Sequence, residues 1–167
     1  MTFTVSSKAY TINDEVSSNS AYYQDIVING NNHEPFYLYQ SIDGLHNIRQ
    51  LTRQSLSLSA LVTNVGGNDV AIRFGIYRFY DPEGELTLSR AVNLKEGINI
   101  IGASIDGMTI PEGATSGASP RVEFRVYITE FTNSCHVQLH YVKAEIGKFI
   151  TPNFCDNFLE KARIANV

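Results

Sequence analysis

The sequence of 167 residues contains no tryptophan, only two cysteines and no run of basic residues. Two cysteines, Cys135 and Cys155, are too few for the disulfide framework of a small secreted domain, so we expect two free thiols in a protein made in the cytoplasm. The net charge of −4 argues against nucleic acid as a partner. No apolar stretch reaches the roughly 18 residues of a membrane span, so we expect no membrane insertion.

The sequence also lacks the short motifs of catalytic and cofactor sites, since no GxSxG, P-loop, HExxH, GxGxxG or CxxC pattern occurs. A glycosidase needs two carboxylates about 5 to 9 Å apart in a cleft, and no such pair stands out. His136 and His140 fall on one expected strand about 13 Å apart, which is too far for one small metal ion. We read these two, together with His33 and His46, as surface histidines, and we expect a protein that is not an enzyme and holds no cofactor.

The carboxylates Asp81, Glu83 and Glu85 surround a turn that contains a proline and a glycine. Together with turn carbonyls they could bind Ca²⁺, or they could form a solvated turn, and the sequence leaves both interpretations open. Because loops at the edge of a sandwich often carry function, residues 80–85 are also a candidate binding loop.

Residues 54–80 contain the clearest pattern, which is two runs of alternating apolar and polar side chains separated by a glycine-containing segment at 65–69. Alternation with a period of two is typical of a strand with one face in a core. We predict two long strands that pair with each other through the turn at 65–69. Their inward side chains are Leu56, Leu58, Ala60 and Val62 in the first run and Val70, Ile72, Phe74 and Ile76 in the second.

Comparable strand patterns, bounded by turn residues, recur along the rest of the chain. We expect further strands at 21–28, 35–41, 85–92, 98–105, 121–130 and 136–145. About nine strands with no convincing helix before residue 153 predict an all-β fold, either an antiparallel sandwich or a barrel. Residues 1–20 are interpreted as a linker or a leading strand, 111–120 as a loop, and 153–167 as a short helix or an extended tail.

Sugar rings are bound by flat aromatic faces together with planar hydrogen-bonding side chains. If the strands around residues 73–77, 123–127 and 138–140 share one sheet, their outward side chains form a single polar and aromatic patch. The candidate carbohydrate-binding residues in this patch are Arg73, Tyr77, Glu123, Arg125, Tyr127 and His140, with Gln138 beside them. Ligand binding, a subunit contact and a solvated sheet face all stay open for it. A second aromatic group is interpreted as core or interface, and consists of Tyr22, Tyr23, Tyr37 and Tyr39.

Two segments resemble the jelly-roll modules of bacteriophage tail fibres and tailspikes. The first is Tyr39-Gln40-Ser41-Ile42-Asp43-Gly44-Leu45, which continues through Leu51 into Ser55-Leu56-Ser57-Leu58-Ser59-Ala60. The second is residues 139–152 (LHYVKAEIGKFITP), which is similar to the closing strand of those modules. The chain departs from the family by lacking tryptophan and by carrying Ser59 and Ala60 where the family has phenylalanine. Tyrosine could replace the missing tryptophan as a stacking surface.

The resemblance implies that residues 21–152 form a jelly-roll sandwich, a non-catalytic module at the end of a phage tail fibre or tailspike in the virion. Such modules bind host cell-surface polysaccharide, support assembly of a homotrimer, or do both. The implied partners are therefore a host polysaccharide, further copies of the chain and the rest of the fibre. Two alternatives stay open: a purely structural trimerisation module without glycan binding, and a glycan-degrading enzyme or its accessory.

Overall fold

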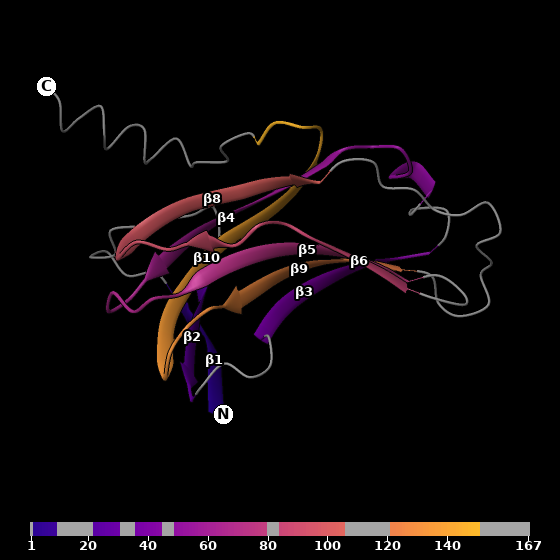
Figure 1. The fold of residues 1–167 in the computed structure, drawn as a ribbon. Helices are drawn as coiled ribbons and strands as arrows, with labels where there is room; N and C mark the ends of the chain where they lie inside the picture. The colour runs from indigo at the N-terminus through magenta and orange to yellow at the C-terminus, as the bar shows by residue number, and fades with distance from the viewer. Residues whose placement is uncertain are drawn as a thin grey trace, which may run out of the picture.

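The computed structural model describes residues 2–9, 22–30, 36–44, 49–79, 84–105 and 121–150. Within these ranges the chain forms ten strands in two antiparallel sheets that are layered on each other (Figure 1). Sheet A has the order β1-β2-β10-β4-β8, and sheet B has the order β3-β9-β5-β6, with β7 pairing with β5. The predicted antiparallel β-sandwich is therefore confirmed.

The strand bounds follow the expected ranges closely. Sheet A consists of β1 (Thr2–Ala9), β2 (Tyr22–Asn29), β10 (Ser134–Ile146), β4 (Leu56–Asn64) and β8 (Gly97–Ile105). Sheet B consists of β3 (Phe36–Asp43), β9 (Arg121–Thr129), β5 (Ala71–Phe79), β6 (Gly84–Leu88) and β7 (Val92–Asn93). The expected strand at 85–92 is thus divided between β6 and β7, and the start of the chain contains a leading strand.

The core lies between the two sheets and is built by the alternation read from the sequence. Successive side chains of a strand point to opposite faces, so one apolar face of each strand is removed from water. The fully buried side chains include Leu58 and Val62 of β4, Phe74 of β5 and Val122 of β9. Cys135 belongs to this core as a free thiol, and burial raises its pKa to about 11. Cys155 lies outside the described residues.

The predicted pairing of the two runs within residues 54–80 is wrong. β4 pairs with β10 and β8 in sheet A, whereas β5 pairs with β9, β6 and β7 in sheet B. The connection contains Gly66 and Gly67, both with positive φ, and it carries the chain from one sheet to the other. The two apolar faces consequently belong to opposite layers of the core instead of standing side by side in one sheet.

Several expectations fall on residues outside the described ranges. These are the loop at 111–120, the helix or tail at 153–167, and the turn carboxylates Asp81 and Glu83. Within the described ranges, no helix is long and apolar enough to cross a membrane.

Candidate functional site

The outer face of sheet B gathers aromatic and charged side chains from neighbouring strands. In β9, the positions 121, 123, 125 and 127 face outward because 122, 124, 126 and 128 face the core. The register places Arg125 opposite Tyr39 of β3 on one side and opposite Gly75 of β5 on the other. We use the name tyrosine–arginine cluster for Tyr37, Tyr39, Tyr77, Glu123, Arg125 and Tyr127.

Arg125 is the centre of this cluster. Its guanidinium carbon lies 4.5 Å from the ring centroid of Tyr37 and 4.3 Å from that of Tyr77, so the cation is held between two aromatic rings. In addition, Nη1 donates a hydrogen bond to the Tyr127 hydroxyl at 3.0 Å, and Nε donates one to Glu123 Oε2 at 2.9 Å. The Arg125 side chain is only 13% exposed, which means that its surroundings fix its position.

Glu123 balances the positive charge beneath the surface. Its carboxylate accepts hydrogen bonds from Arg125 and, at 2.7 Å, from Nε of Arg121, although the residue is only 4% exposed. Burial is the strongest single influence and would raise the pKa of Glu123, but the hydrogen bonds from Arg121 and Arg125 outweigh it and hold this pKa below its usual value. Arg121 also stacks on the Phe79 ring, with its guanidinium carbon 4.4 Å from the centroid.

Two glycines let the aromatic rings of the cluster lie close to the sheet. A Cβ atom at Gly75 would stand 2.7 Å from Cε2 of Tyr127 and 3.1 Å from Cδ2 of Leu88. A Cβ atom at Gly84 would likewise collide with the Tyr77 ring. Tyr127 and Tyr77 therefore occupy the spaces that side chains at Gly75 and Gly84 would fill.

Exposed apolar side chains extend across this face of the sheet from β3 to β6. Tyr39 is 62% exposed, its ring centroid lies 6.2 Å from that of Tyr37, and Leu86 and Leu88 are exposed at the other side of the face. Exposed aromatic and aliphatic groups beside ordered hydroxyls can hold the C–H face of a sugar and bind its hydroxyl groups.

The structure brings most of the sequence-predicted patch together, but not all of it. Tyr77, Glu123 and Tyr127 each contact Arg125. Arg73 lies on the same face, where it forms an ion pair with Glu130 at 3.0 Å.

His140 does not belong to this patch, because it lies in β10 of sheet A, as does Gln138. A β-bulge between Leu139 and Tyr141 changes the register of β10 at this point. There His140 is buried, its Nε2 is 2.8 Å from Thr63 Oγ1, and its ring lies 5.4 Å from that of Tyr23.

The sequence-based interpretation groups Tyr37 and Tyr39 with Tyr22 and Tyr23, and the structure divides this group. β3, which carries the first pair, adjoins β9 in sheet B, whereas β2, which carries the second, lies in sheet A. Tyr37 and Tyr39 share one face of β3, because side chains two residues apart in a strand point the same way. Only the non-local pairing of β3 with β9 places them beside Arg125.

Within the described residues, His136 and Glu85 pair with charged neighbours, and the expected surface position of His140 is wrong because this residue is buried. His33 and His46 lie outside the described ranges. His136 Nε2 lies 2.8 Å from the buried carboxylate of Asp25, which Lys8 and Gln138 also contact. Glu85 forms an ion pair with Arg78 at 2.8 Å, while its predicted partners Asp81 and Glu83 are outside the described ranges. Among the described residues, no group of three potential ligands could hold a metal ion.

The low pKa of Glu123 predicts a loss of stability in acid. A group with a depressed folded-state pKa stabilises the protein above its unfolded-state pKa of about 4.3, and this contribution disappears as the pH falls through the folded-state value. We expect the stability difference between the wild type and Glu123→Gln to be constant above about pH 5 and to shrink below pH 4. Urea unfolding between pH 2.5 and pH 7 measures it, and a difference that does not vary with pH would contradict the prediction.

Comparison with solved structures places the fold among carbohydrate-binding modules. A CBM4 structure matches with a TM-score of 0.53 at 11% identity, over 75% of this chain and 84% of that chain. The CBM22-1 xylan-binding domain of Paenibacillus barcinonensis Xyn10C matches with a TM-score of 0.51 at 10% identity, over 89% of this chain and 83% of that chain. At these identities the likeness establishes the two-sheet jelly-roll fold and nothing further.

A third similar structure is the enzymatically active domain of tailspike protein 4 from bacteriophage CBA120. Its TM-score is 0.49 at 15% identity, and the match spans 87% of this chain but only 18% of that chain, so it carries no functional argument. No protein-family model and no curated protein matches the sequence.

Proposed function

We propose that this chain is a non-catalytic carbohydrate-binding module, and that its glycan lies on the tyrosine–arginine cluster. The observation that carries the proposal is the guanidinium of Arg125 between the rings of Tyr37 and Tyr77. This contact orders two aromatic rings before any ligand arrives, so little side-chain entropy remains to be lost on binding. The fold, which is shared with a xylan-binding domain, supports the same reading.

The binding mode follows from the exposed atoms of the face. The Tyr39 and Tyr37 rings and the side chains of Leu86 and Leu88 offer apolar surface to sugar C–H groups. The row from Tyr39 across Arg125 and Gly75 to Leu88 crosses four strands, or about 14 Å at the usual strand spacing. That length accommodates a short stretch of a glycan chain rather than a single sugar.

Tyr39→Ala tests this placement. Tyr39 is the most exposed ring of the cluster, and we expect its removal to weaken glycan binding by about tenfold, because a stacking surface is lost. The folded state should stay intact, since an exposed ring contributes little to the core. Binding to a panel of polysaccharides is measured by affinity electrophoresis and isothermal titration.

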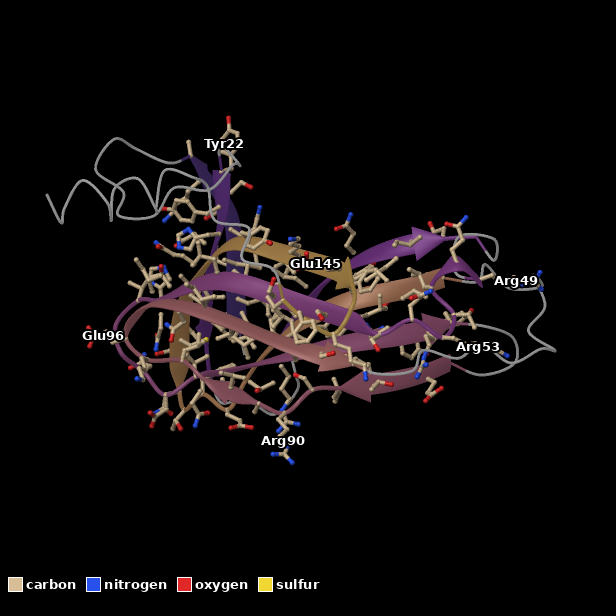
Figure 2. All side chains as sticks on the ribbon, turned by 90° about the horizontal axis from the view of Figure 1, so that it is seen from above. Tyr22, Arg49, Arg53, Arg90, Glu96 and Glu145 are labelled. Atoms are coloured by element: carbon tan, nitrogen blue, oxygen red, sulfur yellow. The ribbon has the colours of Figure 1, made fainter. Side chains whose placement is uncertain are left out.

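The matched control is Tyr22→Ala, which deletes a tyrosine of similar exposure, 57% against 62%, from the start of β2 in sheet A (Figure 2). The control should keep the wild-type affinity. Equal losses of affinity in both variants, or no loss of affinity in Tyr39→Ala, would contradict the placement of the glycan on this face. Release of reducing ends from a bound polysaccharide by the wild-type chain would instead make it an enzyme.

The resemblance to phage tail-fibre modules adds the proposal that the module sits at the end of a homotrimeric fibre or spike in the virion and binds host cell-surface polysaccharide. Three copies would raise a weak affinity per site by multivalency. Light scattering on the purified chain tests the assembly, because a trimer has three times the mass of 18.6 kDa. A trimer that binds no glycan would favour the purely structural module.

A further inference from the structure

The outer face of sheet B is electrically balanced. Its outer strand positions, together with Glu130, carry three arginines and three carboxylates, so the net charge of the face is zero. These residues are Arg73, Arg121, Arg125, Asp43, Glu123 and Glu130. Each arginine is engaged: Arg73 pairs with Glu130, while Arg121 and Arg125 both pair with Glu123. No lysine occurs in β3, β9, β5 or β6.

Glu123 is the carboxylate that contacts two of the three arginines of this face. Its carboxylate accepts from Nε of Arg121 at one oxygen and from Nε and Nη2 of Arg125 at the other, so both oxygens are used. At 4% exposure, the carboxylate lies beneath the surface and has little area left for direct contact with a ligand. Glu123 contacts both guanidinium groups, and its single negative charge offsets one of their two positive charges, while Asp43 lies opposite Arg121 in the register.

Resting on the carbohydrate-binding role proposed above, we propose that the ligand of this face is an uncharged glycan, and that Glu123 sets this preference by occupying both Arg121 and Arg125. An acidic sugar would have to replace a buried ion pair with one of its own, and breaking a buried pair is costly. A neutral sugar can lie on the aromatic and aliphatic surface and bind the tyrosine hydroxyls, and it leaves the ion pairs intact. Glu123 is thus a positioning and specificity residue that does not itself need to touch the ligand.

The proposal predicts a change of specificity. Glu123→Gln removes the negative charge but keeps the side-chain shape, so Arg121 and Arg125 lose the carboxylate that they share, while Asp43 stays opposite Arg121. We expect this variant to bind acidic glycans about tenfold better, relative to neutral ones, than the wild type does, because a charge-assisted hydrogen bond becomes available to the ligand. The matched control is Glu130→Gln, which removes the same charge from the exposed pair with Arg73 on the same face.

The experiment uses polysaccharide pairs that share a backbone and differ in charge: hydroxyethyl and carboxymethyl cellulose, dextran and dextran sulfate, and pectic galacturonan with and without methyl esters. Affinity electrophoresis of the wild type, Glu123→Gln and Glu130→Gln compares the members of each pair. The proposal expects the wild type and Glu130→Gln to prefer the neutral member, and Glu123→Gln to move toward the acidic one. Two outcomes would overturn the proposal: a wild type that binds the acidic member equally well, and a Glu123→Gln variant whose preference is unchanged. Both would leave the carbohydrate-binding function standing.

A second measurement needs no glycan. Thermal unfolding is followed in sodium sulfate and in sodium chloride of the same ionic strength, with sulfate as a small anionic probe. Glu123→Gln should gain about 3 °C more from sulfate than Glu130→Gln does, because it takes the shared carboxylate from two guanidinium groups, whereas Glu130→Gln takes one from Arg73 alone. An equal response of the two variants refutes the role of Glu123. If no polysaccharide binds the wild type, the carbohydrate-binding function fails, and the sulfate response still decides whether Glu123 neutralises an anion site.

If Glu123→Gln does not fold, the wild type alone decides the question. The affinity of the wild type for the neutral and the acidic member of each pair is then measured at increasing salt concentration. Its affinity for an uncharged glycan should stay nearly constant. An affinity that falls steeply with salt would show that the arginines remain available to an anionic ligand, and the proposal would be wrong.

Discussion

Replacing Arg125 with alanine is expected to lower the free energy of unfolding by about 3 kcal/mol and to abolish glycan binding. The change deletes the cation between the rings of Tyr37 and Tyr77 and leaves the buried Glu123 with Arg121 as its remaining partner. A carboxylate that is only 4% exposed cannot recover its hydration, so the loss exceeds that of a surface ion pair. Without the guanidinium between them, the two tyrosine rings also lose the contact that orders them.

The matched control is Arg73→Ala, which removes an arginine from the same face of the neighbouring strand. Its ion pair with Glu130 is exposed, with 38% and 48% of the two side chains accessible to solvent, so we expect a loss below about 1 kcal/mol. Urea unfolding at pH 7 measures both variants, and titration with the bound polysaccharide measures their affinity. Equal losses of stability in the two variants would show that the buried Arg125–Glu123 pair contributes no more to stability than the exposed Arg73–Glu130 pair.

The strands could be predicted from the sequence, but their pairing could not. Alternation is a local property, so Phe74 and its neighbours in β5 already indicate which face of the strand is buried. Which strand lies beside which depends on contacts between residues far apart in the chain. The wrong pairing of β4 with β5 shows this limit, because the apolar faces of the two runs are equally well buried if the strands pair or if they face each other across the core.

The candidate site was predictable to the extent that it depends on two adjacent strands. Tyr77, Glu123 and Arg125 group correctly, because β5 and β9 do pair and their outward positions follow from alternation. The cluster lacked Tyr37 and Tyr39 in the sequence-based interpretation, since nothing local indicates that β3 adjoins β9. His140 was wrongly included in the patch, because nothing local in the sequence indicates that β10 belongs to sheet A.

The role of Glu123 could not be read from the sequence for a different reason. A glutamate two residues from an arginine on either side is compatible with any exposed strand. Only the folded sheet shows that its carboxylate is buried and that both of its oxygens accept hydrogen bonds from the two arginines. Burial of a charge is a property of the assembled face, because it depends on the rings of Tyr37 and Tyr77 above the strand.

Replacing Phe74 with alanine is expected to cost about 4 kcal/mol, because it leaves a cavity between the sheets that the rigid β-strands cannot close. Phe74 is fully buried and is among the largest side chains of the core. A loss of this size is a large share of the roughly 5 to 15 kcal/mol by which domains are stable. Phe74→Leu, which keeps most of the volume, should cost about 1 to 2 kcal/mol. Urea unfolding of the three proteins measures the series.

This variant also separates stability from binding. Phe74 points into the core, whereas the tyrosine–arginine cluster lies on the opposite face of the same sheet, so Phe74→Ala should keep its glycan affinity at temperatures where it remains folded. Arg125→Ala, with a similar loss of stability, should lose binding under the same conditions. If both variants lose binding together, the affinity depends on the general integrity of the sandwich, and the ordered rings around Arg125 would no longer be the basis for placing the glycan there.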